Sequence, residues 1–277
     1  MTGVEVYLVY LLAGILAGLL SGLFGLGGGL TIVPALAVAL PLQGVAPENV
    51  MHLSIGTSLA VMFFTAVYTT VLRSKRGDMS WPLFWHLLPP VAVGTAIGAL
   101  AGSRLPGPAL RVFFVGFVVY MIARALHRHY RKAKSARENG QASGEPVMPS
   151  PASRLASGFT TGLTGSLLGA GAATVTVPYL QAAGYRIQKA SAVAAALSAV
   201  IGIGAGVGYM LGGLDATGLP AATIGYVYLP AFAGMTVGAL LGSPLGVGIS
   251  HRIPEPIQFR LFLCYLVVVL AVMVSHR

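Results

Sequence analysis

Long apolar runs separated by short polar stretches dominate the chain. The first four runs are Val6–Leu42, Val50–Leu72, Trp81–Gly102 and Leu110–Leu126. The second four are Leu155–Gly184, Ala190–Leu211, Ala221–Gly242 and Phe259–Val274. Runs of this kind favour helices of about 20 residues, the length that crosses the hydrocarbon core of a bilayer. A transmembrane β-barrel would instead show segments of about ten residues that alternate apolar and polar. The pattern predicts an all-α polytopic membrane protein.

A polar stretch, His127–Ser153, separates the two sets of runs. It is rich in basic residues and holds glycine, serine and proline clusters, which are typical of a flexible linker. We expect it to be cytoplasmic, because loops on that side collect positive charge. The chain therefore divides into a first transmembrane repeat at residues 1–126, a basic linker at 127–153 and a second transmembrane repeat at 154–277.

The two sets of runs resemble each other in sequence. Gly18–Pro34 aligns without gaps with Gly162–Pro178, 144 residues further along the chain. Pro90–Ser103 aligns with Pro230–Ser243 at an offset of 140 residues. Matches in the same order at a nearly constant offset predict two internal repeats.

The first run of each repeat is interrupted by glycine and proline. Val6–Leu42 would extend about 55 Å as one helix, against a hydrocarbon core of about 30 Å. Because glycine and proline weaken a helix, we predict a broken helix or a hairpin at the start of each repeat. If each first run crosses the membrane twice, each repeat has five crossings and the two repeats are inverted. If each first run crosses once, each repeat has four crossings and the two repeats are parallel. The inverted arrangement is favoured, since only Arg104, Arg111 and Arg277 then lie outside.

The composition supports a lipid-facing exterior and excludes other classes of protein. Hydrophobic residues make up 56% of the chain, charged residues 9%, and the mean hydropathy is +0.81. Soluble domains carry about 25% charged residues. The net charge of +10 does not indicate a nucleic-acid partner, because the basic residues gather in Arg73–Arg76 and in the linker, between apolar runs. We expect a multi-pass protein of the cell inner membrane.

Catalytic chemistry has little support in the sequence. Cys264 is the single cysteine, the six histidines are scattered, and no carboxylate lies deep in an apolar run. Metal sites need clusters of such side chains. We therefore expect no catalytic residues, no metal, no cofactor and no enzyme activity.

The glycine breaks are the candidate substrate site. A helix that restarts after a glycine turn presents free N–H groups and a positive dipole end, which favour anions. In transporters with repeats, such helix starts meet the substrate. The candidate residues of the first repeat are Gly25, Gly27, Gly28, Gly29, Thr31, Pro34, Thr57 and Ser58. Those of the second repeat are Gly169, Gly171, Thr174 and Pro178.

Two alternatives accompany these candidates. The hydroxyls of Thr57 and Ser58 either donate to the substrate or bond back to the preceding helical turn. Further glycines recur at spacings of four residues and indicate faces where helices pack closely, instead of a binding site. These are Gly94, Gly98 and Gly102, with Gly234, Gly238 and Gly242 in the second repeat.

At these motifs the chain resembles a known family. Gly22–Leu36, the following Ile55–Leu59 and the second glycine-proline copy are similar to the TauE/SafE family of sulfite and organosulfur anion exporters. The likeness covers nearly the whole chain. It implies a secondary transporter that exports a small sulfur-containing anion, such as sulfite, sulfoacetate, thiosulfate or a related sulfonate. The chain departs from the pattern at Ala195 and Ala196, where a second Thr-Ser pair would be expected.

Other functions stay open at this point. An anion channel would suit the same repeats, and an intramembrane enzyme is a third candidate, although no set of nucleophile and base supports it. The expected partners are the anion, the lipid bilayer and a coupling ion, either a proton or sodium. The sequence leaves open the identity of the anion, the direction of transport and the formation of a homodimer.

Overall fold

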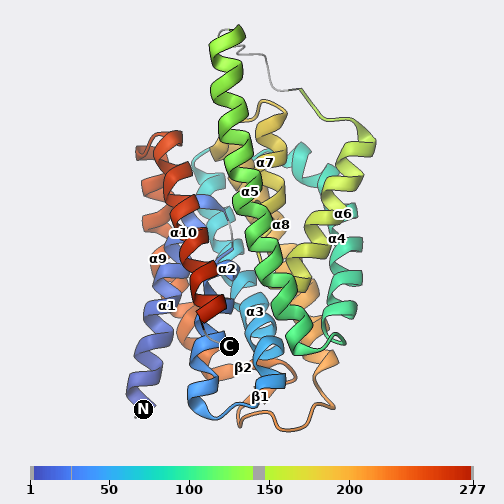
Figure 1. Cartoon of the computed structure of the whole chain (residues 1–277), viewed down its shortest axis with the longest axis vertical. Coiled ribbons are helices and arrows are strands. Elements are labelled where there is room, and N and C mark those ends of the chain that lie inside the picture. The colour runs from blue at the N-terminus through green and yellow to red at the C-terminus, as the bar shows by residue number, and fades with distance from the viewer. Residues whose placement is uncertain (1–2, 26, 140–146, 276–277) are drawn as a thin grey trace.

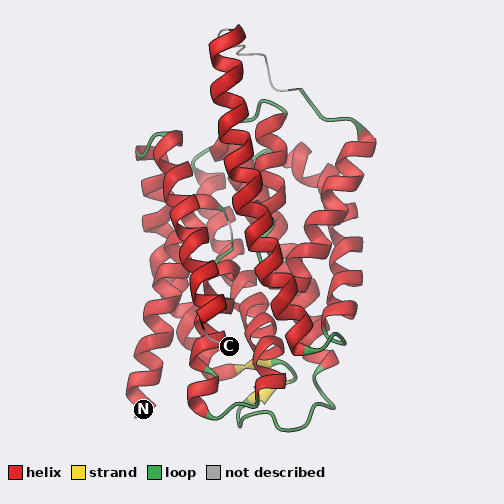
Figure 2. Ribbon diagram, in the orientation of Figure 1, coloured by secondary structure: helices red, strands yellow, loops and turns green. Residues whose placement is uncertain are grey.

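The computed structural model describes residues 3–25, 27–139 and 147–275, and these are almost entirely helical (Figures 1 and 2). The first half forms α1 (Gly3–Phe24), α2 (Gly29–Ala39), the short 3₁₀ helix η1 (Pro41–Gln43), α3 (Pro47–Lys75), α4 (Trp81–Gly102) and α5 (Gly107–Asn139). The second half forms α6 (Pro151–Leu168), α7 (Ala173–Ala182), α8 (Ile187–Gly212), α9 (Leu229–Arg252) and α10 (Glu255–Ser275). Between α8 and α9, the strands β1 (Thr223–Ile224) and β2 (Val227–Tyr228) form an antiparallel pair.

Seven of the described helices are long and apolar enough to cross a membrane. This confirms the prediction of an all-α polytopic membrane protein. Large apolar side chains remain exposed on the outside of the helices, as a lipid-facing surface requires. Examples are Leu8 and Leu12 on α1, Val112 and Phe113 on α5, and Val267 and Val268 on α10.

The long first run of each half turns back on itself. In the first half, the Gln43 side chain after α2 donates a hydrogen bond of 2.5 Å to the Tyr10 hydroxyl near the start of α1. In the second half, the Val147 N–H donates to the Ala183 carbonyl at 3.1 Å, which joins the start of α6 to the end of α7. Each pair is therefore a helical hairpin. Each half contributes five α-helices among the described residues. Since α2, α6 and α7 are not among the seven helices long and apolar enough to cross a membrane, five crossings per half stays a prediction.

The two halves have opposite orientations in the bundle. Figure 1 shows both chain ends toward one end of the bundle and the α5–α6 connection at the other, here named the linker end. Equivalent helices of the two halves pack across the bundle: α1 lies along α9, the equivalent α6 lies along α4, and α3 packs on its equivalent α8. The order and packing of the helices therefore match those of inverted repeats. A common origin of the two halves stays a prediction.

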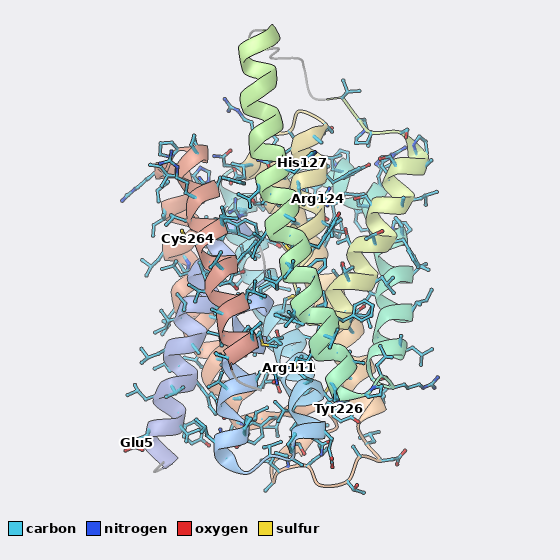
Figure 3. All side chains as sticks on the ribbon, viewed as in Figure 1. Glu5, Arg111, Arg124, His127, Tyr226 and Cys264 are labelled. Atoms are coloured by element: carbon cyan, nitrogen blue, oxygen red, sulfur yellow. The ribbon has the colours of Figure 1, made fainter. Side chains whose placement is uncertain are left out.

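The basic residues follow the predicted bias toward one end. Figure 3 shows Arg124 and His127 part-way along α5, closer to the linker end of the bundle than Arg111, which lies near the opposite end of the same helix. Arg111 donates to the Met273 carbonyl at 2.7 Å, so it lies beside the end of α10. Cys264, also labelled in Figure 3, is an exposed free cysteine on α10.

Two predicted element boundaries differ in the structure. α5 continues to Asn139, so the first part of the stretch predicted as linker is helical. Its Lys, Arg, Ala and Glu residues are good helix formers. The run predicted from Ala221 to Gly242 begins instead with the β1–β2 pair, whose turn contains Gly225 at φ 53°, and α9 then extends from Leu229 to Arg252. Residues 140–146 lie outside the described part, and the division into repeats and linker stays a prediction.

Rows of glycine bring pairs of helices into backbone contact. A Cβ at Gly94 or Gly98 of α4 would overlap carbonyl oxygens of α6. A Cβ at Gly238 or Gly242 of α9 would overlap carbonyl oxygens of α1 in the same way. The predicted helix-packing role of these glycines is confirmed, and it fixes the two hairpins against the rest of the bundle.

We expect Gly98→Ala to lower the thermal midpoint of the detergent-purified protein. The new methyl group would overlap the Ser166 hydroxyl and crowd the Leu163 carbonyl oxygen, and overpacking costs about 1–3 kcal/mol. Gly116→Ala is the matched control, because Gly116 lies inside α5 with no atom within 4 Å of its Cβ position. The control should leave the midpoint unchanged or raise it. Equal losses in both variants would contradict the packing role.

Candidate functional site

The two glycine breaks lie against each other in the interior of the bundle. Gly29 begins α2 and Gly169 follows the end of α6. A Cβ at Gly29 would overlap the carbonyl oxygen of Gly169. The described residues of 25–31 and all of 165–176 are buried. The two breaks therefore form one buried junction, made from both halves of the chain.

The first break ends in a helix start with free donors. Gly28 has a φ of 86°, a left-handed conformation that strains any residue with a side chain. Its carbonyl accepts the first hydrogen bonds of α2, from the N–H groups of Thr31 at 3.0 Å and Ile32 at 3.2 Å. The N–H groups of Gly29 and Leu30 precede these bonds. They belong to the first turn, where backbone donors have no partner within the helix.

The second break ends in a comparable helix start. The Ala172 carbonyl accepts from the N–H groups of Val175 at 3.2 Å and Thr176 at 2.9 Å. The N–H groups of Ala173 and Thr174 precede these bonds. Two helix starts, each with a positive dipole end, therefore approach the junction from opposite halves.

Two serines on the central helices hold the junction. The Ser58 hydroxyl on α3 donates to the Gly169 carbonyl at 3.0 Å and lies 3.4 Å from the Gly29 carbonyl. The Ser198 hydroxyl on α8 accepts from the Ala172 N–H at 2.8 Å. Ser198 was not among the predicted residues. Its signal in the sequence is a polar residue inside the apolar run Ala190–Leu211.

The other glycines and prolines predicted for the site lie around this junction. Gly25 packs on the backbone of Ser191, and Gly27 lies beside Met62 and Ser198. Gly171 is buried between α6 and α7. Pro34 and Pro178 lie inside α2 and α7, at equivalent places in the two hairpins.

The predicted threonines point elsewhere. Thr57 accepts the Tyr228 N–H at 2.9 Å and so holds β2, while Ser58 faces the breaks. The Thr31 hydroxyl bonds the Tyr265 hydroxyl of α10 at 3.0 Å. Thr174 donates to the Gly171 carbonyl at 3.1 Å within its own turn. The structure therefore brings the glycines and Ser58 together at the junction. The hydroxyls of Thr57, Thr31 and Thr174 already form hydrogen bonds with other groups.

Arg73 is a buried charge that sequence reasoning missed. It lies in the last turn of α3 and is fully buried. Its guanidinium donates to the Gly22 carbonyl at 2.6 Å, at the end of α1, and to the Gln188 carbonyl at 3.4 Å. It also lies 3.7 Å from the Asp78 carboxylate. A cation near the carbonyls that end a helix is stabilising, so Arg73 supports α1 directly before the first break.

Comparison with known proteins identifies the family. The sequence pattern described as "Sulfite exporter TauE/SafE" matches residues 10–274. The chain belongs to the TauE/SafE family. A "Probable membrane transporter protein" of Haemophilus influenzae is 30% identical over 265 residues, which cover 95% of this chain and 96% of that protein. A relative with a similar description from Methanocaldococcus jannaschii is 26% identical over 251 residues, or 87% and 85% of the two chains. No solved structure matches.

TauE/SafE membership and the apolar helices make this chain a multi-pass membrane transporter. The predicted family resemblance is confirmed. The part of the chain that the structure describes brings no three His, Cys, Asp or Glu side chains together as a metal site requires. The junction of the two breaks is built from backbone groups and the hydroxyls of Ser58 and Ser198. Backbone N–H groups at helix starts are donors of the kind that bind anions.

Proposed function

We propose that this protein is a secondary transporter that exports a small sulfur-containing oxyanion across the inner membrane without altering it chemically. Sulfite, sulfoacetate, thiosulfate and related sulfonates are the candidate substrates. The observation that carries the proposal is the buried junction at Gly29 and Gly169, where two helix starts meet. Helix starts bind anions through free N–H groups and the dipole. Membership of a family described as a sulfite exporter supports the choice of anion.

The anion binds between the two breaks in this proposal. The donors are N–H groups of the first turns of α2 and α7, near Gly29 and Ala173. Such donors converge on the oxygens of a tetrahedral or pyramidal anion. Backbone N–H groups carry no full positive charge, so they bind the anion weakly enough for it to be released. Ser58 joins them when its hydroxyl turns from the Gly169 carbonyl.

Binding requires the two hairpins to separate. Gly29 and Gly169 are in backbone contact, so the structure represents a closed junction with no space for an oxyanion between them. Transporters with inverted repeats move one part of the bundle against the other around a central site. The α1–α2 and α6–α7 hairpins are the elements that carry the site, and we propose that they are the parts that move.

The first test is transport by purified protein in proteoliposomes. We expect saturable uptake of sulfite or sulfoacetate, driven by a proton or sodium gradient, and weaker uptake of acetate. The same anions should raise the thermal midpoint in detergent, because a ligand at 100 times its Kd stabilises the folded state by about 2.7 kcal/mol. Flux that does not saturate and needs no gradient would favour a channel. Absence of both flux and thermal shift for every sulfur-containing anion would contradict the proposal.

A further inference from the structure

A cavity of about 640 Å³ opens at the linker end of the bundle. It lies among the α3–α4, α7–α8 and α9–α10 connections, away from the junction of the breaks. Its charged and titratable lining consists of Asp78, Arg186, Lys189, His251 and Arg252. We name this cavity the vestibule.

The lining of the vestibule carries unbalanced positive charge. Arg186, Lys189 and Arg252 are exposed, and none of them forms an ion pair with a carboxylate among the side chains that the structure describes. The Asp78 carboxylate is already engaged, because it accepts from the His251 ring at 3.0 Å and lies 3.7 Å from Arg73. A surface recess lined mainly by cations concentrates anions from solution.

Arg73 lies between the vestibule and the first break. On one side its guanidinium contacts Asp78 and the Gln188 carbonyl, and both of these residues line the vestibule. On the other side it contacts the Gly22 carbonyl, three residues before Gly25. Its Nε atom is buried without a hydrogen-bond partner in the described part of the chain. A buried guanidinium with one unused N–H can donate it to an oxyanion, and a charged donor makes a strong hydrogen bond.

We propose that the vestibule is an oxyanion-binding site on the linker side of the breaks, where the anion displaces the Asp78 carboxylate from the Arg73 guanidinium. In the structure, the Asp78 carboxylate occupies the position beside Arg73 that the anion would take. The exposed cations attract the arriving anion, and Arg73 takes it up beside the end of α1. The inference rests on the proposed function for the identity of the anion. Lipid phosphate shares the same chemistry, so the test must separate the two sources.

The test measures sulfoacetate binding by titration calorimetry, with the whole protein in phosphatidylcholine nanodiscs. We expect the triple variant Arg186→Gln, Lys189→Gln, Arg252→Gln to bind about 10-fold more weakly, since each exposed charge contributes modestly. We expect Asp78→Asn to bind several-fold more tightly, because it lacks the competing charge. Added salt should weaken binding to the wild type more than to the triple variant. Arg104→Gln is the control, an exposed arginine beyond the opposite end of α4.

The outcomes separate this inference from the proposed function. If the wild type transports the anion but the triple variant and Asp78→Asn bind it as the wild type does, the vestibule proposal is wrong and the transporter proposal stands. The triple variant changes only exposed side chains, so its folding is not at risk, and a thermal midpoint checks Asp78→Asn. If adding phosphatidylglycerol to the nanodiscs abolishes sulfoacetate binding to the wild type, lipid phosphate occupies the vestibule and the proposal is overturned.

Discussion

Gly29→Ala is expected to abolish transport and to lower the thermal midpoint. A Cβ at this position would overlap the Gly169 carbonyl oxygen and lie 3.1 Å from the Ala170 Cα. Both neighbours are backbone atoms, so the two hairpins must move apart to accept the methyl group and the junction can no longer close. Overpacking of this kind costs about 1–3 kcal/mol or more. The displacement also breaks the Ser58 hydrogen bond to Gly169. Anion flux in proteoliposomes and thermal unfolding in detergent measure the two effects.

Gly206→Ala is the matched control for this prediction. Gly206 is also a buried helical glycine, in α8, but the nearest atom to its Cβ position lies 3.7 Å away, an ordinary contact. Alanine favours the helix over glycine by about 1 kcal/mol. We expect the control to keep wild-type flux and to be at least as stable as the wild type. Wild-type flux in Gly29→Ala would show that contact between the two breaks is not needed for transport.

The sequence predicts a break in the first run of each half and favours inverted halves, but it leaves a broken helix and a hairpin as alternatives. Val6–Leu42 is too long for one crossing and contains four closely spaced glycines, so a break was expected from helix energetics alone. The bias of basic residues then favoured inverted halves. The contact between Gly29 and Gly169 was not predictable, because it depends on how α3 and α8 pack together in the centre.

The choice between Thr57 and Ser58 also lay beyond the sequence. Neighbouring residues on a helix point about 100° apart, so only one of the two hydroxyls can face the breaks. Which one does so depends on the rotation of α3 about its axis. The structure turns Ser58 toward the breaks and Thr57 toward Tyr228.

The basic cluster Arg73–Arg76 lies between two apolar runs, so the sequence predicts a loop position for Arg73. α3 continues to Lys75 in the structure, so Arg73 still lies within the helix. Its main partner, the Gly22 carbonyl, belongs to the last turn of α1 and is available only because α1 ends at the break. The sequence predicts the break, but only the three-dimensional packing shows that the Gly22 carbonyl freed by the break accepts a hydrogen bond from Arg73.

Arg73→Met is expected to lower the free energy of unfolding by about 3 kcal/mol or more, because breaking a buried ion pair is costly and the Asp78 carboxylate then keeps only its contact with the His251 ring. The end of α1 loses the donor to Gly22, so the first break is no longer held and flux should fall severely. Arg73→Lys should recover only part of the stability, since one ammonium group cannot reach Gly22, Gln188 and Asp78 together.

Arg76→Gln provides the control for Arg73→Met. Arg76 belongs to the same basic cluster, but it is exposed and donates only to the Val247 carbonyl at 3.1 Å among the described residues. Denaturant unfolding in detergent should show a loss below about 1 kcal/mol for this variant. The double variant Arg73→Met, Asp78→Asn should lose less than the sum of its single variants, because it removes both charges of the pair. If Arg73→Met and Arg76→Gln lose the same small amount of stability, Arg73 does not hold the end of α1 and does not connect the vestibule to the first break.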